Sequence, residues 1–444
     1  MTTTVSLVSL IPDATHSTGQ LPPLDWMTAA ETRQVIAALQ AGGAAVRFVG
    51  GCVRDTIAHR PITDIDIATP DLPETVIKLL ETAAIRAIPT GIAHGTVTAV
   101  CNGQHFEITT LRRDEVTDGR HATVAFTDNW LEDAKRRDFT INAMSATPDG
   151  DVFDPFDGIA DLAQGRVRFV GKAGQRVQED YLRILRFFRF FGAYARPPMD
   201  GDAQAACRAH AENLTTLSGE RVRDELLKIL LTPEPADIAM RMRGLNVLEQ
   251  ILPEAGDINR LRLINWLETR AVNIDQVTPD PIRHLAALLD TDSIGAAAVA
   301  QRLRLSNDQK ARLIDLTEPE ISVGPDMGEP AERRAIRHHG APRVRDLALM
   351  AWAGELVDTT RLARQRTEAY IALLERCAQW IPPDFPLTGA DVLALGVARG
   401  PDIGTMLDRV EAWWENTDYQ AGRQECLDRL MKVVRETKAA GGTP

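Results

Sequence analysis

The sequence predicts an α/β head followed by a long all-helical body. Between residues 31 and 148, short strand-like runs alternate with helical runs, which is typical of a mixed sheet packed against helices. From Gln175 onward nearly every segment has helical periodicity, and strand-like alternation disappears. We therefore expect these parts: a loose leader over 1–30, the head over 31–148, a neck of helices over 149–232, and a helical body and tail over 233–444.

Local signals justify the elements of the head in order. The pattern predicts a helix over 30–43, closed by two glycines, and a strand over 44–49 that runs into the turn Gly50-Gly51. A second strand is predicted over 62–69 and a helix over 73–83. Two alternating runs then flank Asn102-Gly103, which is the strongest short signal for a β-hairpin.

Composition and charge exclude several classes of protein. The chain is 44% hydrophobic and 25% charged, as in ordinary globular proteins, and no run approaches the ~20 apolar residues of a membrane span. Its five cysteines are scattered without a C-x-x-C pair, so we expect an intracellular, reduced, cytoplasmic protein. The net charge of −12 argues against indiscriminate coating of nucleic acid. Residues 166–194 are locally basic, which suits either a phosphate-bearing ligand or a solvated helix face.

The segment ITDIDIAT supplies two candidate metal ligands. Strict alternation along a strand places Asp64 and Asp66 on one face and the isoleucines on the other. Paired carboxylates repel each other, and a cation such as Mg²⁺, held by carboxylates and substrate phosphates, removes this repulsion. An exposed strand face is the alternative. Glu107 alternates in the same way in the hairpin, so it is either a third carboxylate on a neighbouring strand or a solvated position.

The turn before these aspartates suits a phosphate group. Gly50 and Gly51 lie between a strand and a helix, where backbone N–H groups can approach a phosphate closely. Arg54 follows on that helix as a candidate phosphate donor. A glycine pair alone is most often just a turn, so the signal depends on the neighbouring aspartates.

Several stretches, in one order, resemble the bacterial tRNA nucleotidyltransferase and poly(A) polymerase family, the class II enzymes of the DNA polymerase β-like nucleotidyltransferases. The stretches are GGCVRD…DIDIAT, GTVTAV…FEITTLRRD, RRDFTINAM, EDYLRILRFFRF and SGERVRDELLKIL, within about residues 45–232. One departure is TIAHRP, where the family usually has Leu-Gly. The chain also contains no His-Asp dipeptide, so the HD phosphohydrolase module of some relatives is not expected.

The resemblance implies roles for these residues. Gly50, Gly51 and Arg54 would hold the triphosphate, and Asp64 and Asp66 would bind Mg²⁺, with Glu107 grouped with them as a catalytic candidate. Further nucleotide contacts would come from Arg137, Asp138 and Asn142. Residues 111–126 resemble the mobile loop of the family.

Asp180 and Arg183 are candidates for reading the nucleobase. If both residues lie on one helix, they share a face. The alternative to base reading is a salt bridge between the two side chains. Cytosine and adenine both present an amino donor beside a ring-nitrogen acceptor, so a carboxylate beside an arginine accepts both and disfavours guanine and uracil. The resemblance assigns Arg186 and Arg189 to the nucleotide as well, and salt bridges or tRNA phosphates are the alternatives.

The predicted reaction is template-independent addition of C, C and A to the 3′ end of tRNA, from CTP and ATP, with release of pyrophosphate. The expected partners are tRNA and the two nucleotides, with no membrane, and the helical body would bind the RNA. Alternatives are a poly(A) polymerase that adds only A, a specialist that adds only CC or only A, and an RNA-binding protein on an inactive scaffold. The sequence does not predict an oligomeric state.

Overall fold

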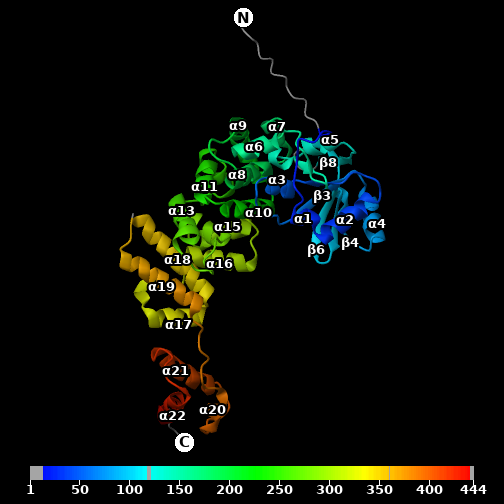
Figure 1. The fold of residues 1–444 in the computed structure, drawn as a ribbon. Helices are drawn as coiled ribbons and strands as arrows, with labels where there is room; N and C mark the ends of the chain where they lie inside the picture. Colours follow the sequence, from blue (N-terminus) through cyan, green and yellow to red (C-terminus); the bar gives the residue numbers. More distant parts are fainter. Residues whose placement is uncertain (1–13, 118–121, 360, 441–444) are drawn as a thin grey trace. The chain divides into compact units, whose positions relative to one another are not determined.

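The computed structural model describes residues 14–117, 122–359 and 361–440, and it forms two compact units (Figure 1). The first unit comprises Met1–Pro253 and Arg302–Arg304, and the second comprises Glu254–Gln301 and Leu305–Pro444. The predicted boundary between neck and body, at 232/233, falls inside the first unit because α11 (Pro235–Gly244) packs on α8 (Leu182–Tyr194). The finer division of this unit into head and neck stays a prediction.

A mixed eight-stranded sheet forms the centre of the head, in the order β1-β10-β9-β2-β3-β6-β5-β4. Only β3 and β6 pair in parallel within the described sheet. The strands are β1 (Gly19–Gln20), β2 (Arg47–Val49), β3 (Ile65–Thr69), β4 (Arg86–Gly91), β5 (Thr96–Cys101), β6 (Gln104–Thr110), β9 (Ser145–Ala146) and β10 (Asp151–Phe153). The predicted mixed sheet is confirmed.

Helices α2 (Ala30–Gln40) and α4 (Pro73–Thr82) pack on this sheet (Figure 1). Their apolar side chains join those of the strands in one core that includes Leu39, Phe48, Ile67, Leu80 and Phe106. The predicted hairpin is also confirmed: β5 and β6 pair antiparallel across Asn102 and Gly103, whose φ angles are 48° and 84°. The core therefore holds the sheet in the register that presents Asp66 on its other face.

The described part of the predicted leader, residues 14–30, is not loose. Strand β1 extends the sheet beside β10, and Met27 of α1 (Asp25–Thr28) is buried in the head core. Ala14 is also buried, and its carbonyl accepts a hydrogen bond from Arg47. The prediction of a loose leader is wrong for these residues because they supply a strand and apolar cover to the sheet. Residues 1–13 lie outside the described part of the chain.

The segment expected to be a mobile loop is largely a hairpin. Strands β7 (Arg112–Thr117) and β8 (Ala122–Phe126) pair antiparallel, and the residues between them, 118–121, lie outside the described part. Helix α5 (Trp130–Lys135) and the short turn η2 (Thr140–Asn142) follow.

The remainder of the first unit is helical and surrounds α8. Its helices are α3 (Gly51–Ile57), α6 (Gly158–Gln164), α7 (Ala173–Glu179), α9 (Gly201–His210), η3 (Ala211–Thr216), α10 (Gly219–Leu230) and α12 (Leu248–Ile251). Residues 302–304 complete this unit against the start of α10. Arg223 donates to the Arg304 carbonyl at 2.7 Å, and a Cβ at Gly219 would lie 2.0 Å from the Arg302 carbonyl oxygen.

The described residues of the second unit form helices, as predicted for the body. The helices are α13 (Ile258–Trp266), η4 (Leu267–Ala271), α14 (Pro281–Leu288), α15 (Ser293–Arg302), α16 (Asn307–Thr317), η5 (Pro325–Met327), α17 (Glu329–His339), α18 (Ala341–Asp358), α19 (Arg364–Gln379), α20 (Gly389–Ala394), α21 (Asp402–Asn416) and α22 (Arg423–Ala440). Across the described ranges of the chain, no helix combines the length and apolarity needed to span a lipid bilayer.

Candidate active site

Strand β3 and the residue before it carry the two aspartates. Ile65 and Ile67 point into the head core, so Asp64 and Asp66 lie on the opposite face, as predicted. The parallel register pairs Asp66 with Glu107 of β6, which confirms that the third carboxylate lies on the neighbouring strand. Asp66 is partly buried, whereas Asp64 and Glu107 are exposed.

The arginines near Asp66 do not fully neutralise the negative charge of the neighbouring carboxylates. Burial is the largest cause that raises the pKa of Asp66 to about 6, and the charges of Glu107 and Asp64 raise it further. Arg137 and Arg54 act in the opposite direction but do not cancel these effects. A divalent cation beside Asp64 and Asp66 would neutralise the repulsion between these carboxylates, so the residues fit such an ion. Two carboxylates supply part of the ligand set of such an ion, and substrate phosphates can supply the rest.

The turn that leads into α3 requires glycine. Gly50 has a φ of +68°, and a Cβ there would lie 3.1 Å from Nη1 of Arg137 and 3.8 Å from Oδ2 of Asp66. Arg137 is held over this turn by Asp133, 3.1 Å away. Gly50 thus leaves room for a guanidinium beside the metal-binding candidate.

A chain of hydrogen bonds joins α3 to α8. Arg54 Nη1 donates to Asn142 at 2.6 Å, and Asn142 Nδ2 donates to Asp138 at 2.9 Å. Asp138 also forms an ion pair with Arg186 at 2.6 Å. Burial opposes ionisation of Asp138, but the charge of Arg186 and the hydrogen bonds from Asn142 and Arg186 outweigh it and lower the pKa of Asp138. This carboxylate therefore stays ionised between the two helices.

Asp180 and Arg183 do not share a helix face. Helix α7 ends at Glu179, Asp180 is extended with a φ of −157°, and α8 begins at Leu182. The expected single helix is wrong here because the Asp180 carboxylate instead accepts the N–H of Leu182, at 3.1 Å.

These two residues also have different ion-pair partners. Asp180 pairs with Arg221 of α10 at 2.7 Å, and Arg183 pairs with Glu179 at 2.5 Å. The alternative of a salt bridge between Asp180 and Arg183 is therefore not found among the described ion pairs. Both residues nevertheless line one cavity.

This cavity of about 450 Å³ collects most of the predicted site. The predicted residues that line it are Gly50, Gly51, Arg54, Asp66, Arg137, Asp138, Asn142, Asp180, Arg183 and Arg186. Asp64, Glu107 and Arg189 do not line it. Arg189 instead pairs with Glu225 at 2.7 Å, which agrees with the salt-bridge alternative for this residue.

Three residues of the cavity were not predicted: Arg112, Arg136 and Phe190. Both arginines belong to arginine pairs, in LRRD and KRRDF, and the sequence signal was the pair itself. The direction of the backbone, at the start of β7 and at the end of α5, determines which arginine of each pair faces the cavity. The presence of a pair in the sequence does not identify that arginine.

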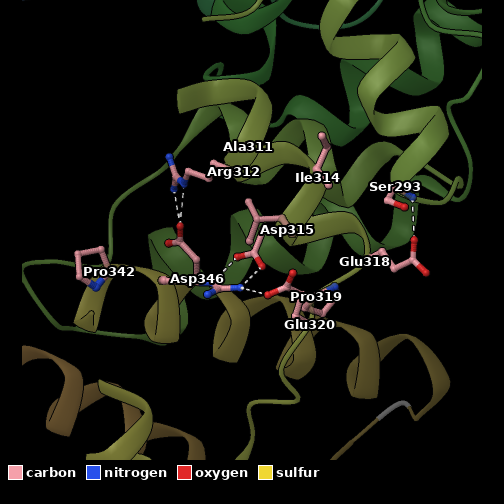
Figure 2. Close-up of a pocket in the computed structure, with 12 residues that line it drawn as sticks. Ser293, Ala311, Arg312, Ile314, Asp315, Glu318, Pro319, Glu320, Pro342 and Asp346 are labelled. Carbon is pink, nitrogen blue, oxygen red and sulfur yellow. Dashed lines mark hydrogen bonds and ion pairs between the residues drawn. The ribbon is translucent and has the colours of Figure 1, made fainter. Parts of the chain in front are cut away.

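A larger cavity of about 920 Å³ lies in the second unit, but its charged groups satisfy one another (Figure 2). Arg343 binds Asp315 at 2.5 and 2.8 Å, and Arg312 binds Asp346 at 2.7 Å. Glu318 accepts the N–H of Ser293 at 3.0 Å. This cavity therefore shows no group in need of a ligand, and the smaller one in the first unit is the candidate active site.

The mixed-sheet head brings the paired carboxylates, the glycine turn and an arginine-rich cavity together, as the resemblance to nucleotidyltransferases implies. Comparison with known families agrees: residues 46–168 match the poly A polymerase head domain, and residues 198–258 match the probable RNA and SrmB-binding site of polymerase A.

Individual relatives narrow this class. The mitochondrial CCA tRNA nucleotidyltransferase 1 of Homo sapiens is 34% identical over 401 residues, 87% of each chain. A CCA-adding enzyme of Leuconostoc citreum is 42% identical over 203 residues, which are 45% of this chain and 49% of that one. The crystal structure of the Bacillus stearothermophilus CCA-adding enzyme in complex with CTP has a TM-score of 0.71 and 26% identity, and the match covers 95% of this chain and 100% of that one. The chain belongs to the CCA tRNA nucleotidyltransferase family.

Proposed function

We propose that this protein adds C, C and A to the 3′ end of tRNA from CTP and ATP, without a nucleic-acid template, and releases pyrophosphate. One observation carries the proposal: a single cavity is lined by the carboxylate of Asp66, by Arg54 and Arg137, and by Asp180 and Arg183. It therefore offers groups for a metal, a triphosphate and a nucleobase at one place. The relatives, which are named for CCA addition to tRNA, support the same reaction.

Asp64 and Asp66 are the proposed ligands of Mg²⁺. When bound, the cation would activate the 3′-hydroxyl of the RNA and stabilise the charge that develops at the α-phosphate during in-line displacement. Glu107, beside Asp66, helps to keep the pKa of Asp66 high until that cation binds. We therefore assign Glu107 an electrostatic role beside the two ligands.

The arginines of the cavity hold the nucleotide. Gly50 and Gly51 leave the backbone open to a phosphate, and Arg54 and Arg137 donate to the triphosphate as charge-assisted hydrogen bonds. Asp138, kept ionised by Arg186, accepts a hydrogen bond from the ribose. Because these groups are positioned before the nucleotide arrives, the rate enhancement comes mainly from orientation and electrostatics.

Asp180 and Arg183 read the base. Asp180 accepts the amino group that cytosine and adenine share, and Arg183 donates to the adjacent ring nitrogen. Guanine and uracil present the reverse pattern and would leave buried groups unpaired, at a cost of about 1–3 kcal/mol each. One pair of side chains can thus select both substrates without a template.

Primer extension tests this function. Purified protein with Mg²⁺ is given tRNA transcripts that end before CCA, after C and after CC, with each labelled nucleotide offered separately and together. Addition of C, C and A followed by a stop is the expected result, and Asp64→Ala/Asp66→Ala is the blank. Open-ended addition of A would identify a poly(A) polymerase, and addition of only CC or only A would identify a specialist. No incorporation on any primer would overturn the proposal.

We propose a cytoplasmic location, although the human relative is named mitochondrial. All five cysteines are buried free thiols, which supports a reducing compartment. Fractionation of the source cells tests this.

A further inference from the structure

The last residue of α8, Tyr194, reaches the helix that carries Arg54. Its hydroxyl donates a hydrogen bond to Oδ1 of Asp55 at 2.5 Å. Asp55 in turn accepts two hydrogen bonds from the guanidinium of Arg54, from Nε at 3.0 Å and from Nη2 at 2.8 Å. Tyr194 therefore acts on Arg54 through a shared carboxylate, and it does not line the cavity itself.

Arg54 is held in place by several neighbouring side chains. Its guanidinium lies 4.5 Å from the ring centroid of Tyr194 and 5.1 Å from that of Phe190, and Nη1 donates to Asn142. An arginine has five N–H donors, and the described contacts of Arg54 use three of them. Arg54 lines the cavity, so its two remaining donors are available to a phosphate there.

Tyr194 is itself held in place by the chain that follows α3. The guanidinium of Arg60 lies 4.2 Å from its ring centroid, and Arg60 also donates to the carbonyl of Ala193. Burial is the largest cause that raises the pKa of Tyr194, so its hydroxyl remains a neutral donor at physiological pH. The contact with Asp55 thus connects α3 and α8.

We propose that Tyr194 is a positioning residue for the triphosphate: through Asp55, it holds Arg54 in the rotamer that presents its two unused N–H groups to the cavity. This role rests on the proposed function of the cavity. Helix α8 carries the base-reading candidate Arg183 near its start and Tyr194 at its end. Tyr194 therefore fixes the phosphate-binding arginine to the same helix that reads the base.

The variant Tyr194→Phe tests the role because it keeps the ring over Arg54 and removes only the hydroxyl. With full-length protein and primer extension, we expect the KM for CTP and for ATP to rise equally, by about 5-fold to 10-fold, because the variant loosens the orientation of Arg54 but leaves its own N–H donors in place. The KM for tRNA should not change. Product inhibition separates the phosphates from the base: the Ki of inorganic pyrophosphate should rise by a similar factor, and the Ki of CMP should stay within about 2-fold.

The second unit offers a matched control. Tyr370 donates to Glu355 at 2.7 Å, and Glu355 accepts two hydrogen bonds from Arg366, so a tyrosine, a carboxylate and an arginine are connected in the same order far from the cavity in sequence, with glutamate in place of aspartate. Tyr370→Phe should lower the melting temperature about as much as Tyr194→Phe but leave every KM unchanged. A purely structural role for Tyr194 predicts that the two variants behave alike.

Coupling between residues provides a second readout. If Tyr194 acts through Asp55, the double variant Asp55→Asn/Tyr194→Phe should bind pyrophosphate no worse than Asp55→Asn alone, because the connection is already broken. Additive losses would overturn the proposal, and so would an unchanged Ki of pyrophosphate in Tyr194→Phe or an equal rise in the Ki of CMP. Wild-type protein that extends no primer would instead overturn the proposed function.

Discussion

Both units of the molecule contain a dense cluster of ion pairs. The two clusters differ in whether protein groups satisfy all of their charges and donors. In the second unit, Arg283 is 2% exposed and binds Glu268 and Asp346, each at 2.5 Å, and the carbonyl of Thr278. In the first unit, the cluster around Asp66 opens into a cavity, Arg54 keeps unused donors, and the carboxylates of Asp66 and Glu107 are neighbours.

This difference separates two uses of buried charge. A buried charge whose partners are all protein groups leaves nothing for a ligand, and it holds helices together at a high cost if one partner is lost. A cluster with like charges side by side and unused donors is poorly balanced until something binds, which is why shifted pKa values concentrate at functional sites. The following variants test whether the two clusters behave in these opposite ways.

The largest expected effect is on the closed cluster. Arg283→Met removes the cation that Glu268 and Asp346 share and leaves them only His284 and Arg312 as partners, so we expect the free energy of unfolding to fall by about 3 kcal/mol. Urea denaturation measures this. The fraction of Arg283→Met protein that remains folded should have the same KM values for CTP and ATP as the wild type. A loss of less than about 1 kcal/mol would contradict the comparison.

The same kind of change in the open cluster should affect activity. Asp66→Asn preserves the size of the side chain but removes the negative charge proposed to bind Mg²⁺, and we expect kcat for nucleotide addition to fall at least about 100-fold. Single-turnover primer extension measures this. Glu107→Gln, which alters a neighbouring carboxylate outside the cavity, should cost far less, and an equal loss for both variants would show that the two carboxylates have one role.

Asp66→Asn should also stabilise the protein when divalent cations are absent. Because the pKa of Asp66 is raised from 3.8 to about 6 in the folded protein, the contribution of this carboxyl to stability is present below about pH 4 and is lost as the pH rises through 6. At pH 8 in EDTA, the variant should gain up to about 3 kcal/mol over the wild type. Denaturation at several pH values should show that this gain grows between about pH 4 and pH 6 and then levels off. A gain that does not depend on pH would refute the assigned cause.

The smallest expected effect concerns the chain of hydrogen bonds between α3 and α8. Asn142→Ala removes the contacts that join Arg54 to Asp138, so we expect the KM for both nucleotides to rise by about 3-fold to 10-fold with little change in kcat. Steady-state kinetics measure this, and Asn265→Ala, a buried asparagine of the second unit, is the control that should change stability alone. A fall in kcat without a change in KM would assign Asn142 to the chemical step.

Part of the site could be read from the sequence because local rules govern it. Period-two alternation in a strand determines which face Asp66 occupies, and Asn-Gly specifies the hairpin that carries Glu107. Together with one parallel pairing, these rules bring the two carboxylates together. Ile65 and Ile67, on either side of Asp66, are buried in the head core, so hydrophobicity fixes the register.

Other parts depend on contacts distant in sequence. The break between α7 and α8 has no Gly or Pro, and helical periodicity continues through it, so the sequence predicted one helix. Asp180 leaves the helix because its carboxylate accepts the N–H of Leu182 and pairs with Arg221, 41 residues further along the chain. For the same reason, spacing alone does not assign the arginine partners within the cavity. The sequence likewise gives no sign that Gly19 and Gln20, within the predicted leader, pair with β10.

The discontinuous make-up of the first unit has a consequence for synthesis. Helix α10 packs against residues 302–304, where Gly219 approaches the carbonyl of Arg302 and Arg223 binds that of Arg304. Ribosomes add about 5–20 residues per second, so roughly 3–10 s separate the completion of residue 253 from that of residue 304. During this interval helices α7, α8 and α10 are made but lack the contact with residues 302–304. A nascent chain arrested before residue 302 should therefore present α10 to proteases, and one arrested well beyond 304 should protect it.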